Sequence, residues 1–113
     1  MQALYKQGDI VFVPYPYTDL TQTKKRPVII ISKDRINKEN LIVAKITSVI
    51  RNDEFSFPLK EKDLYNKLNR QSEVRTNELF TIHKTLIIKK FARLKKLPLK
   101  ELTTNIQANI SAE

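Results

Sequence analysis

The sequence has no cysteine, a single histidine and a single glycine in 113 residues. The absence of cysteine excludes a disulfide-stabilised scaffold, a thiolate zinc site and a cysteine nucleophile. One histidine, His83, cannot by itself build an all-imidazole metal site. No apolar run approaches the ~18 residues of a membrane span, and no apolar signal segment follows Met1–Lys6. We therefore expect a cytoplasmic protein without a metal or other cofactor.

Positive charge dominates the residues that are present. Lys and Arg number 21 against 12 Asp and Glu, which gives a formal net charge of +9. The densest basic stretch runs from Lys84 to Lys100 and contains no acidic residue. Such an excess favours an anionic partner, nucleic acid first, through counterion release and electrostatic steering. A solvated surface that keeps the protein in solution is the alternative explanation for this stretch.

The length fits one domain, and we expect residues 1–113 to form it. β-Branched and aromatic runs predict strands over residues 9–14, 28–32, 41–48, 55–59, 72–76, 79–82 and 87–94. The continuous apolar run at 28–32 predicts a central strand buried on both faces. Pro14 and Pro16 are expected to stop regular pairing, which leaves Tyr15–Lys25 as a long polar loop.

A helix is predicted at the end of the chain. Pro98 suits a helix start, and apolar residues follow at spacings of three and four, so we expect an amphipathic helix over 98–110. Charged residues 60–69 predict a short helix or turn, and Gly8 is expected to need an unusual backbone angle. The whole pattern predicts a mainly β protein with a small, strongly bent, barrel-like sheet, which fits several binding folds.

Four short motifs together resemble the MazF/PemK family of toxin endoribonucleases from type II toxin–antitoxin pairs. Gly8–Pro14 (GDIVFVP) is followed by Arg26–Ser32 (RPVIIIS), as in the family's first two strands. The third strand of the family ends in Thr-Ser, here Thr47 and Ser48, and a later segment ends in a Thr-Ile pair, here within Val74–Ile82. The resemblance covers about residues 7–110 and implies an SH3-like small barrel of the MazF/CcdB type with short helices and a C-terminal helix.

The resemblance also implies an activity and its partners. Family members are mRNA interferases that cut single-stranded RNA at short sequences without a metal. The 2′-hydroxyl attacks the adjacent phosphate and leaves a cyclic phosphate and a free 5′-hydroxyl. The implied partners are single-stranded RNA, a second copy in a homodimer and a cognate antitoxin with an acidic tail. The active groove is expected at the dimer face, under the loop between the first two strands.

Three residues match catalytic positions of the family. The reaction needs proton transfer and cations that stabilise charge on the phosphorane. Arg26 matches the arginine of the R-P motif, whose fork suits a phosphate. Thr47 matches the strand-end threonine, and Arg75 matches an arginine that acts in acid–base and phosphate contacts in the PemK/Kid branch. The alternatives are a structural arginine at the sheet rim, a strand-end cap and a surface cation, respectively.

The chain departs from the family pattern at the residues that would act as bases. Asn77 stands where the PemK/Kid branch has an aspartate, and an amide cannot take a proton, so we expect it to contact RNA. Glu78 stands where the MazF branch has a glutamine, and it is a candidate for base or RNA contact. Asp19 is a candidate base when the loop closes, since the loop has no histidine. His83 is expected to be a surface turn residue.

Other residues are expected to bind the RNA chain. Lys24 and Lys25 lead into Arg26, and three consecutive cations at the exit of a loop attract a phosphate backbone. Tyr17 is suited to stacking an unpaired base or to packing the base of the loop, and Ser48 would support Thr47. Two other functions stay open: a CcdB-like toxin that acts on a topoisomerase, and a basic barrel that binds RNA without cutting it.

Overall fold

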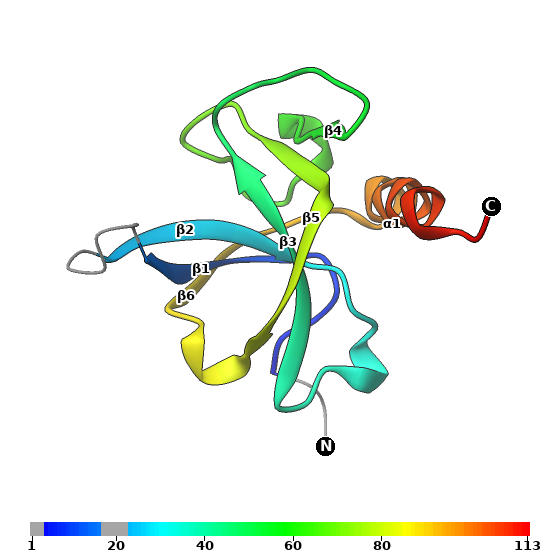
Figure 1. The fold of residues 1–113 in the computed structure, drawn as a ribbon. Helices are drawn as coiled ribbons and strands as arrows, with labels where there is room; N and C mark the ends of the chain where they lie inside the picture. Colours follow the sequence, from blue (N-terminus) through cyan, green and yellow to red (C-terminus); the bar gives the residue numbers. More distant parts are fainter. Residues whose placement is uncertain (1–3, 17–22) are drawn as a thin grey trace.

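The computed structural model describes residues 4–16 and 23–113. Within these residues, one antiparallel sheet contains the strands β1 (Asp9–Pro16), β2 (Thr23–Ile30), β3 (Asn40–Thr47), β4 (Ser56–Pro58), β5 (Glu73–His83) and β6 (Lys89–Arg93). The strand order is β4-β5-β3-β2-β1-β6, and the sheet curls into a half-barrel (Figure 1). Single 3-10 turns η1 (Asp34–Ile36), η2 (Glu61–Asp63) and η3 (Lys84–Leu86) and the helix α1 (Lys96–Ile110) complete the fold. The predicted mainly β class is confirmed.

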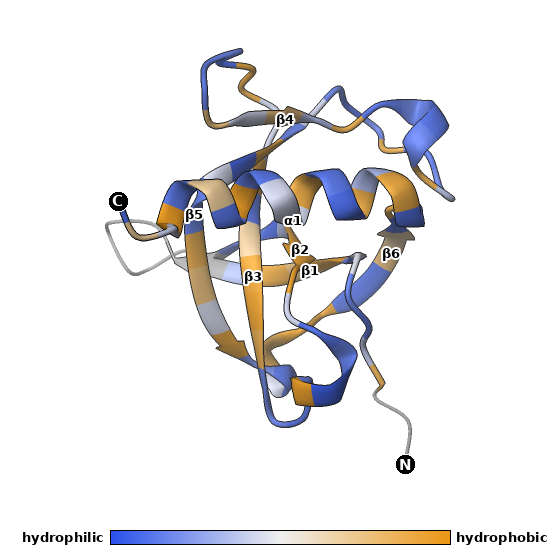
Figure 2. Ribbon diagram, turned by 90° about the vertical axis from the view of Figure 1, so that its right-hand side faces the viewer, coloured by the Kyte–Doolittle hydropathy of each residue, from blue (hydrophilic) through white to orange (hydrophobic). Residues whose placement is uncertain are grey.

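Each face of the sheet carries an apolar cluster. On one face, α1 lies across the strands (Figure 2) and buries Leu102 and Ile106 against Ile10 and Ile29. On the other face, a second cluster is formed by Val11, Val13, Val28, Ile30, Leu41, Val43 and Ile82. Successive residues of a strand point to opposite faces, and both faces of β2 are covered. The expected central strand, buried on both sides, is therefore confirmed.

The first two strands are longer than the sequence predicts. Pro14 pairs with Lys25 and Pro16 with Thr23, so the expectation that the prolines stop pairing is wrong. The backbone oxygen of Phe12 accepts from Ile88 N on the side away from β2. Pro14 and Pro16 share this orientation by alternation, so no hydrogen bond to β2 is lost where a proline lacks its N–H. The loop predicted over 15–25 is accordingly shorter at both ends.

Three further boundaries differ from the expectation. The two strands predicted over 72–76 and 79–82 are one irregular strand, β5, which begins at Glu73, and the second strand begins at Thr23 and ends at Ile30. Helix α1 begins at Lys96, and its predicted apolar stripe ends at Ile106 because Ile110 is 70% exposed. Gly8 has the expected unusual backbone angle, with φ +93°. In the described part of the chain, no helix is long and apolar enough to cross a membrane.

Candidate functional site

An irregularity in β5 sits next to the end of β3. The pairing of β3 with β5 jumps from Ala44–Leu79 to Ile46–Val74, so four residues of β5, Arg75–Glu78, stand against the single residue Lys45. A bulge of this kind turns side chains out of the regular alternation of a strand. The break in pattern at Asn77 and Glu78 is also why the sequence predicts two short strands here.

Arg26 and Thr47 lie at the same end of neighbouring strands and on the same face of the sheet. Strands β2 and β3 pair from Ile30–Val43 to Val28–Lys45, and Arg26 and Thr47 each lie two residues beyond that last pair. Val28 belongs to the cluster on the face away from α1, and Arg26 and Thr47 share this orientation by alternation along their strands. Both strands continue past their last paired rung, and they diverge there (Figure 1).

Lys45 and Glu78 join this face. Lys45 alternates with Thr47 on β3, and its Nζ lies 3.5 Å from Glu78 Oε1. Glu78 is 41% exposed, which leaves its carboxylate accessible from solvent. No sequence motif assigns a role to Lys45, although its position two residues before Thr47 in a predicted strand places both side chains on one face. The face therefore combines two cations, one hydroxyl and one carboxylate.

Arg75 is buried in a network of three carboxylates. Its side chain is 5% exposed and donates to Asp53 at 2.9 and 3.1 Å, to Glu73 at 2.6 Å and to Glu78 at 3.3 Å. Arg75 also donates to Ser56 Oγ at 3.0 Å, and Ser56 donates to Glu73 at 2.6 Å. The guanidinium thus faces carboxylates of β5 and of the β3–β4 loop (48–55) in this arrangement.

The same network shifts the pKa values of its members. The hydrogen bond from Arg75 lowers the pKa of the Asp53 carboxyl from 3.8 to about 2. Burial alone would raise the pKa of Glu73, but hydrogen bonds from Ser56, Arg75 and two backbone N–H groups outweigh it, so the pKa is lowered. The pKa of Arg75 is raised above its ordinary value, first by its hydrogen bond to Asp53. All three groups are therefore held in their charged forms.

The β3–β4 loop is held in place by Glu73. Glu73 is 2% exposed, and its Oε1 accepts from the backbone N–H groups of Arg51 at 3.2 Å and Asn52 at 3.4 Å. Asn52 has φ 51°, in the left-handed region that asparagine tolerates better than most residues. No sequence motif assigns a role to Glu73 or Asp53, because nothing in the sequence connects the loop with β5.

Thr47 caps the start of this loop. Its Oγ1 accepts a hydrogen bond from Val49 N at 3.0 Å, which leaves the hydroxyl hydrogen for another acceptor. The expected alternative of a strand-end cap thus describes part of what Thr47 does. Ser48 follows it and is exposed, so a molecule bound at Thr47 would pass close to a second hydroxyl.

The remaining predicted residues lie next to this face, on the opposite face of the sheet (Lys25) or outside the described residues. Lys24 and Lys25 are exposed, and Lys25 Nζ lies 4.7 Å from the centre of the Phe12 ring. Asn77 is exposed on the bulge. Tyr17 and Asp19 lie outside the described residues, so their expected roles stay predictions. His83 is exposed at the end of β5, as expected for a turn histidine, with Nδ1 2.8 Å from Thr85 Oγ1.

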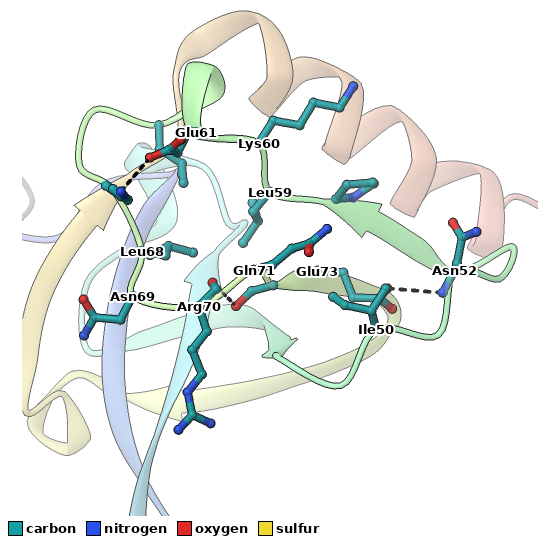
Figure 3. A pocket seen from close by; sticks show the side chains of 14 residues that line it. Ile50, Asn52, Leu59, Lys60, Glu61, Leu68, Asn69, Arg70, Gln71 and Glu73 are labelled. Carbon is teal, nitrogen blue, oxygen red and sulfur yellow. Dashed lines mark hydrogen bonds and ion pairs between the residues drawn. The ribbon is translucent and has the colours of Figure 1, made fainter.

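Glu73 also lines a pocket of about 680 Å³ (Figure 3). Ile50 and Asn52 of the β3–β4 loop form one wall, and the segments 58–61 and 67–73 form the rest together with Leu64. Lys60 and Arg70 extend from it in opposite directions (Figure 3). Among the described residues, no group of three or more His, Cys, Asp and Glu side chains is arranged to hold a metal ion.

Comparisons with known proteins point to one family. A family model described as the PemK-like, MazF-like toxin of type II toxin–antitoxin systems matches residues 6–110. The comparison with curated proteins gave no match.

Solved structures share the fold across almost the whole chain. A MazE–MazF complex from Deinococcus radiodurans superposes with a TM-score of 0.79 at 15% identity, covering 97% of this chain and 98% of that chain. A mycobacterial endoribonuclease in complex with its cognate antitoxin gives 0.78 at 12% identity, with 96% and 97% covered. The Mycobacterium tuberculosis toxin MazF-mt6 gives 0.68 at 22% identity, with 91% and 98% covered. The curled six-stranded sheet with a C-terminal helix is thus a MazF-like fold.

Proposed function

Because the chain belongs to the PemK-like, MazF-like toxin family of type II toxin–antitoxin systems, we propose that it is an endoribonuclease that cleaves single-stranded RNA at a short sequence without a metal ion. The observation that supports this most directly is the face shared by Arg26, Lys45, Thr47 and Glu78. That face offers a phosphate both positive charge and a hydroxyl donor, and it offers a 2′-hydroxyl a carboxylate acceptor.

The proposed reaction is a transesterification. Glu78 takes the proton of the 2′-hydroxyl, and the 2′-oxygen attacks the adjacent phosphorus. The bond from phosphorus to the 5′-oxygen breaks, which leaves a 2′,3′-cyclic phosphate. The departing 5′-oxygen receives a proton from the Lys45 ammonium, which lies 3.5 Å from Glu78 Oε1.

Arg26 and Thr47 are proposed to stabilise the transition state. The Arg26 guanidinium would donate two parallel hydrogen bonds to the non-bridging phosphate oxygens, where negative charge grows. The Thr47 hydroxyl would donate its unassigned hydrogen to the same phosphate, with Ser48 beside it. Lys24, Lys25 and Asn77 would hold the flanking RNA at the rim of the site.

Arg75 is proposed to act through Glu78. Its Nε donates to Glu78 Oε2 at 3.3 Å while its other nitrogens bind Asp53 and Glu73, so a phosphate would have to displace a carboxylate to reach it. Arg75 would thus orient the proposed base and fix the loop that follows Thr47. We therefore assign it a positioning role in the free protein.

The partners follow from the family and from the charge. We propose that two copies form a homodimer whose interface borders the site, and that a cognate antitoxin inhibits the protein in the cytoplasm. Because this protein has a net charge of +9, an acidic antitoxin segment would be electrostatically complementary to it.

The test is incubation of the purified protein with a long single-stranded RNA in the presence of EDTA. Discrete fragments with cyclic phosphate and 5′-hydroxyl ends are expected, and Arg26→Ala is expected to abolish them while the folded dimer persists. Lys38→Ala, which removes an exposed cation before β3, is the matched control and should cleave normally. Intact RNA that shifts on a gel would indicate binding alone, and intact RNA with gyrase inhibition would indicate a CcdB-like toxin.

A further inference from the structure

The pocket that Glu73 lines borders the proposed active site. Thr47 of β3 pairs with Glu73 of β5, and opposite residues of an antiparallel pair point to one face of the sheet. Glu73 also pairs with Pro58 of β4, which lines the pocket too. Ile50 forms part of the wall and follows Thr47 by three residues, so the two Cα atoms lie within about 11 Å of each other. A strand of RNA that is bound at Thr47 therefore has the pocket within close reach.

Hydrogen bonds to Glu73 fix one wall of this pocket. Its Oε1 accepts from the backbone N–H groups of Arg51 and Asn52. Its Oε2 accepts from Ser56 Oγ and from Arg75, both at 2.6 Å. Both oxygens are therefore used, and the charge of the carboxylate is neutralised by Arg75. A ligand in the pocket would meet a preformed wall and no uncompensated negative charge from Glu73.

The interior of the pocket combines apolar walls with a side-chain amide. Leu59 and Leu64 belong to the buried cluster under α1, Leu68 packs against that cluster, and Ile50 is 45% exposed. Figure 3 shows the amide of Gln71 near the middle of the pocket. Within residues 4–16 and 23–113, this amide has no hydrogen-bond partner. Apolar walls with a small number of polar groups, in a volume of about 680 Å³, are typical of sites for small ligands.

Positive charge stands on two sides of the pocket. Lys60 and Arg70 are exposed and extend in opposite directions (Figure 3). Neither side chain has an ion pair with another residue of the part of the chain that the structure describes. The other charged residues of the lining are compensated, since Glu61 pairs with Lys67 at 3.2 Å and Glu73 is neutralised within its own network. The rim of the pocket therefore keeps a net positive charge.

We propose that this pocket binds one unpaired base of the RNA, close to the cut bond, and so contributes to the choice of sequence. The inference rests on the proposed function for the identity of the ligand. The Gln71 amide offers a donor and an acceptor to the edge of a base, and Ile50 and Leu68 offer apolar contact to its faces. Lys60 and Arg70 would bind the phosphates on either side of that base. An apolar side chain of a protein partner would fit the walls but leave the amide unpaired, which is unfavourable.

The experiment combines a change in the pocket with a change in the RNA. The cut is mapped on a long RNA, and an oligonucleotide of the mapped sequence is made with 2′-deoxyribose at the cut, so that it binds without being cleaved. One base at a time is then removed, and the affinity is measured by fluorescence anisotropy. Removal of one base near the cut should weaken binding to the unmodified protein about tenfold. Gln71→Ala should bind the intact oligonucleotide about tenfold more weakly and lose no further affinity when that base is removed.

Matched variants isolate the pocket. Gln107→Ala removes an exposed glutamine of α1 and should respond to every removed base like the unmodified protein. Gln71→Ala should keep the melting temperature of the unmodified protein, because the Gln71 side chain is exposed. Arg70→Ala should lower the logarithmic slope of affinity against salt by about 0.7, the contribution of one phosphate contact on a single strand. Lys38→Ala should leave that slope unchanged.

The possible outcomes separate this proposal from the proposed function. Equal responses of Gln71→Ala and the unmodified protein to every removed base would overturn the base pocket even if RNA is cleaved. If no RNA is cut, a sequence enriched by binding from a random RNA pool takes the place of the mapped one. A base whose removal matters only when Gln71 is present would then support the pocket and remove the nuclease activity. A pool that yields no bound sequence would overturn both.

Discussion

Glu73 and Arg75, two residues apart on β5, form a buried ion pair of 2.6 Å. Alternation places both side chains on one side of the strand, and Glu73 then binds the backbone of the β3–β4 loop while Arg75 binds Asp53 in the same loop. The pair therefore connects the loop that follows Thr47 to the strand that carries Glu78. Two segments of the proposed site are positioned by one interaction.

Removing the cation of this pair should destabilise the fold strongly. Arg75→Met leaves Glu73 buried without its partner, and we expect the free energy of unfolding to fall by about 3–5 kcal/mol. Urea unfolding followed by circular dichroism measures the change. Lys67→Met is the control, because the Lys67–Glu61 pair is exposed and should contribute less than about 1 kcal/mol. Equal effects of the two substitutions would contradict a structural role for Arg75.

Acid should weaken the same network. Folding lowers the pKa of Asp53 from 3.8 to about 2 and also lowers that of Glu73 from 4.5, so ionisation of both favours the folded state. The stabilisation is complete above the unfolded pKa values and is lost as the pH falls toward 2. Urea midpoints across this range should decline less steeply in Asp53→Asn. Parallel pH profiles of the variant and the unmodified protein would rule out the contribution of Asp53.

The hydroxyl of Thr47 should matter for rate more than for stability. Thr47→Val keeps the shape of the side chain but removes the proposed donor to the phosphate, and we expect the single-turnover cleavage rate to fall about 10²–10³-fold. Thr47→Ser keeps the hydroxyl and should retain most of the activity. The RNA affinity is measured alongside. A loss of affinity with an unchanged rate would assign Thr47 to binding alone.

RNA affinity should depend on salt, and Arg26 should account for part of that dependence. A cation that neutralises one phosphate of a single strand contributes about 0.7 to the logarithmic slope of affinity against salt. Arg26→Ala should lower the slope by this amount. Lys38→Ala, exposed in the turn before β3, should leave it unchanged. A flat salt response of the unmodified protein would mean that its net charge is not used to bind RNA.

Gly8 should resist substitution. Its φ is +93°, and an added Cβ would lie 3.1 Å from Leu99 Cδ2 of α1. Gly8→Ala therefore combines backbone strain with crowding of the helix, and we expect a loss of about 1–3 kcal/mol in unfolding free energy. The melting temperature reports this. An unchanged melting temperature would show that the turn before β1 adapts freely.

The strands and the helix were predictable because each carries its own periodicity. The continuous apolar run at 28–32 predicts a strand covered on both faces, and the spacing of Leu99, Leu102 and Ile106 predicts the helix. The ends of β1 and β2 were not predictable, since the orientation of Pro14 and Pro16 relative to β2 is a property of the sheet and not of the dipeptides. The exposure of Ile110 was not predictable, because the spacing of apolar residues does not show where the sheet beneath a helix ends.

The candidate site was predictable only in part. Arg26, Thr47 and Glu78 could be named from motifs, and the first two lie just beyond the last pair of β2 with β3. The surroundings of Arg75 could not be foreseen. Asp53 lies 22 residues away on a loop, and nothing in either segment indicates that they meet. The sequence alone does not distinguish a charged residue that is neutralised by tertiary contacts from one that is available to bind a ligand.

The four residues of β5 that stand against Lys45 have a consequence for how this protein diversifies. Regular ladders resume on both sides of the bulge, at Ala44–Leu79 and at Ile46–Val74. A substitution at an exposed position of the bulge, such as Asn77, should therefore leave the strand pairing on either side unchanged. Related chains should be able to exchange residues here, and with them the preferred RNA sequence, while the architecture is inherited unchanged.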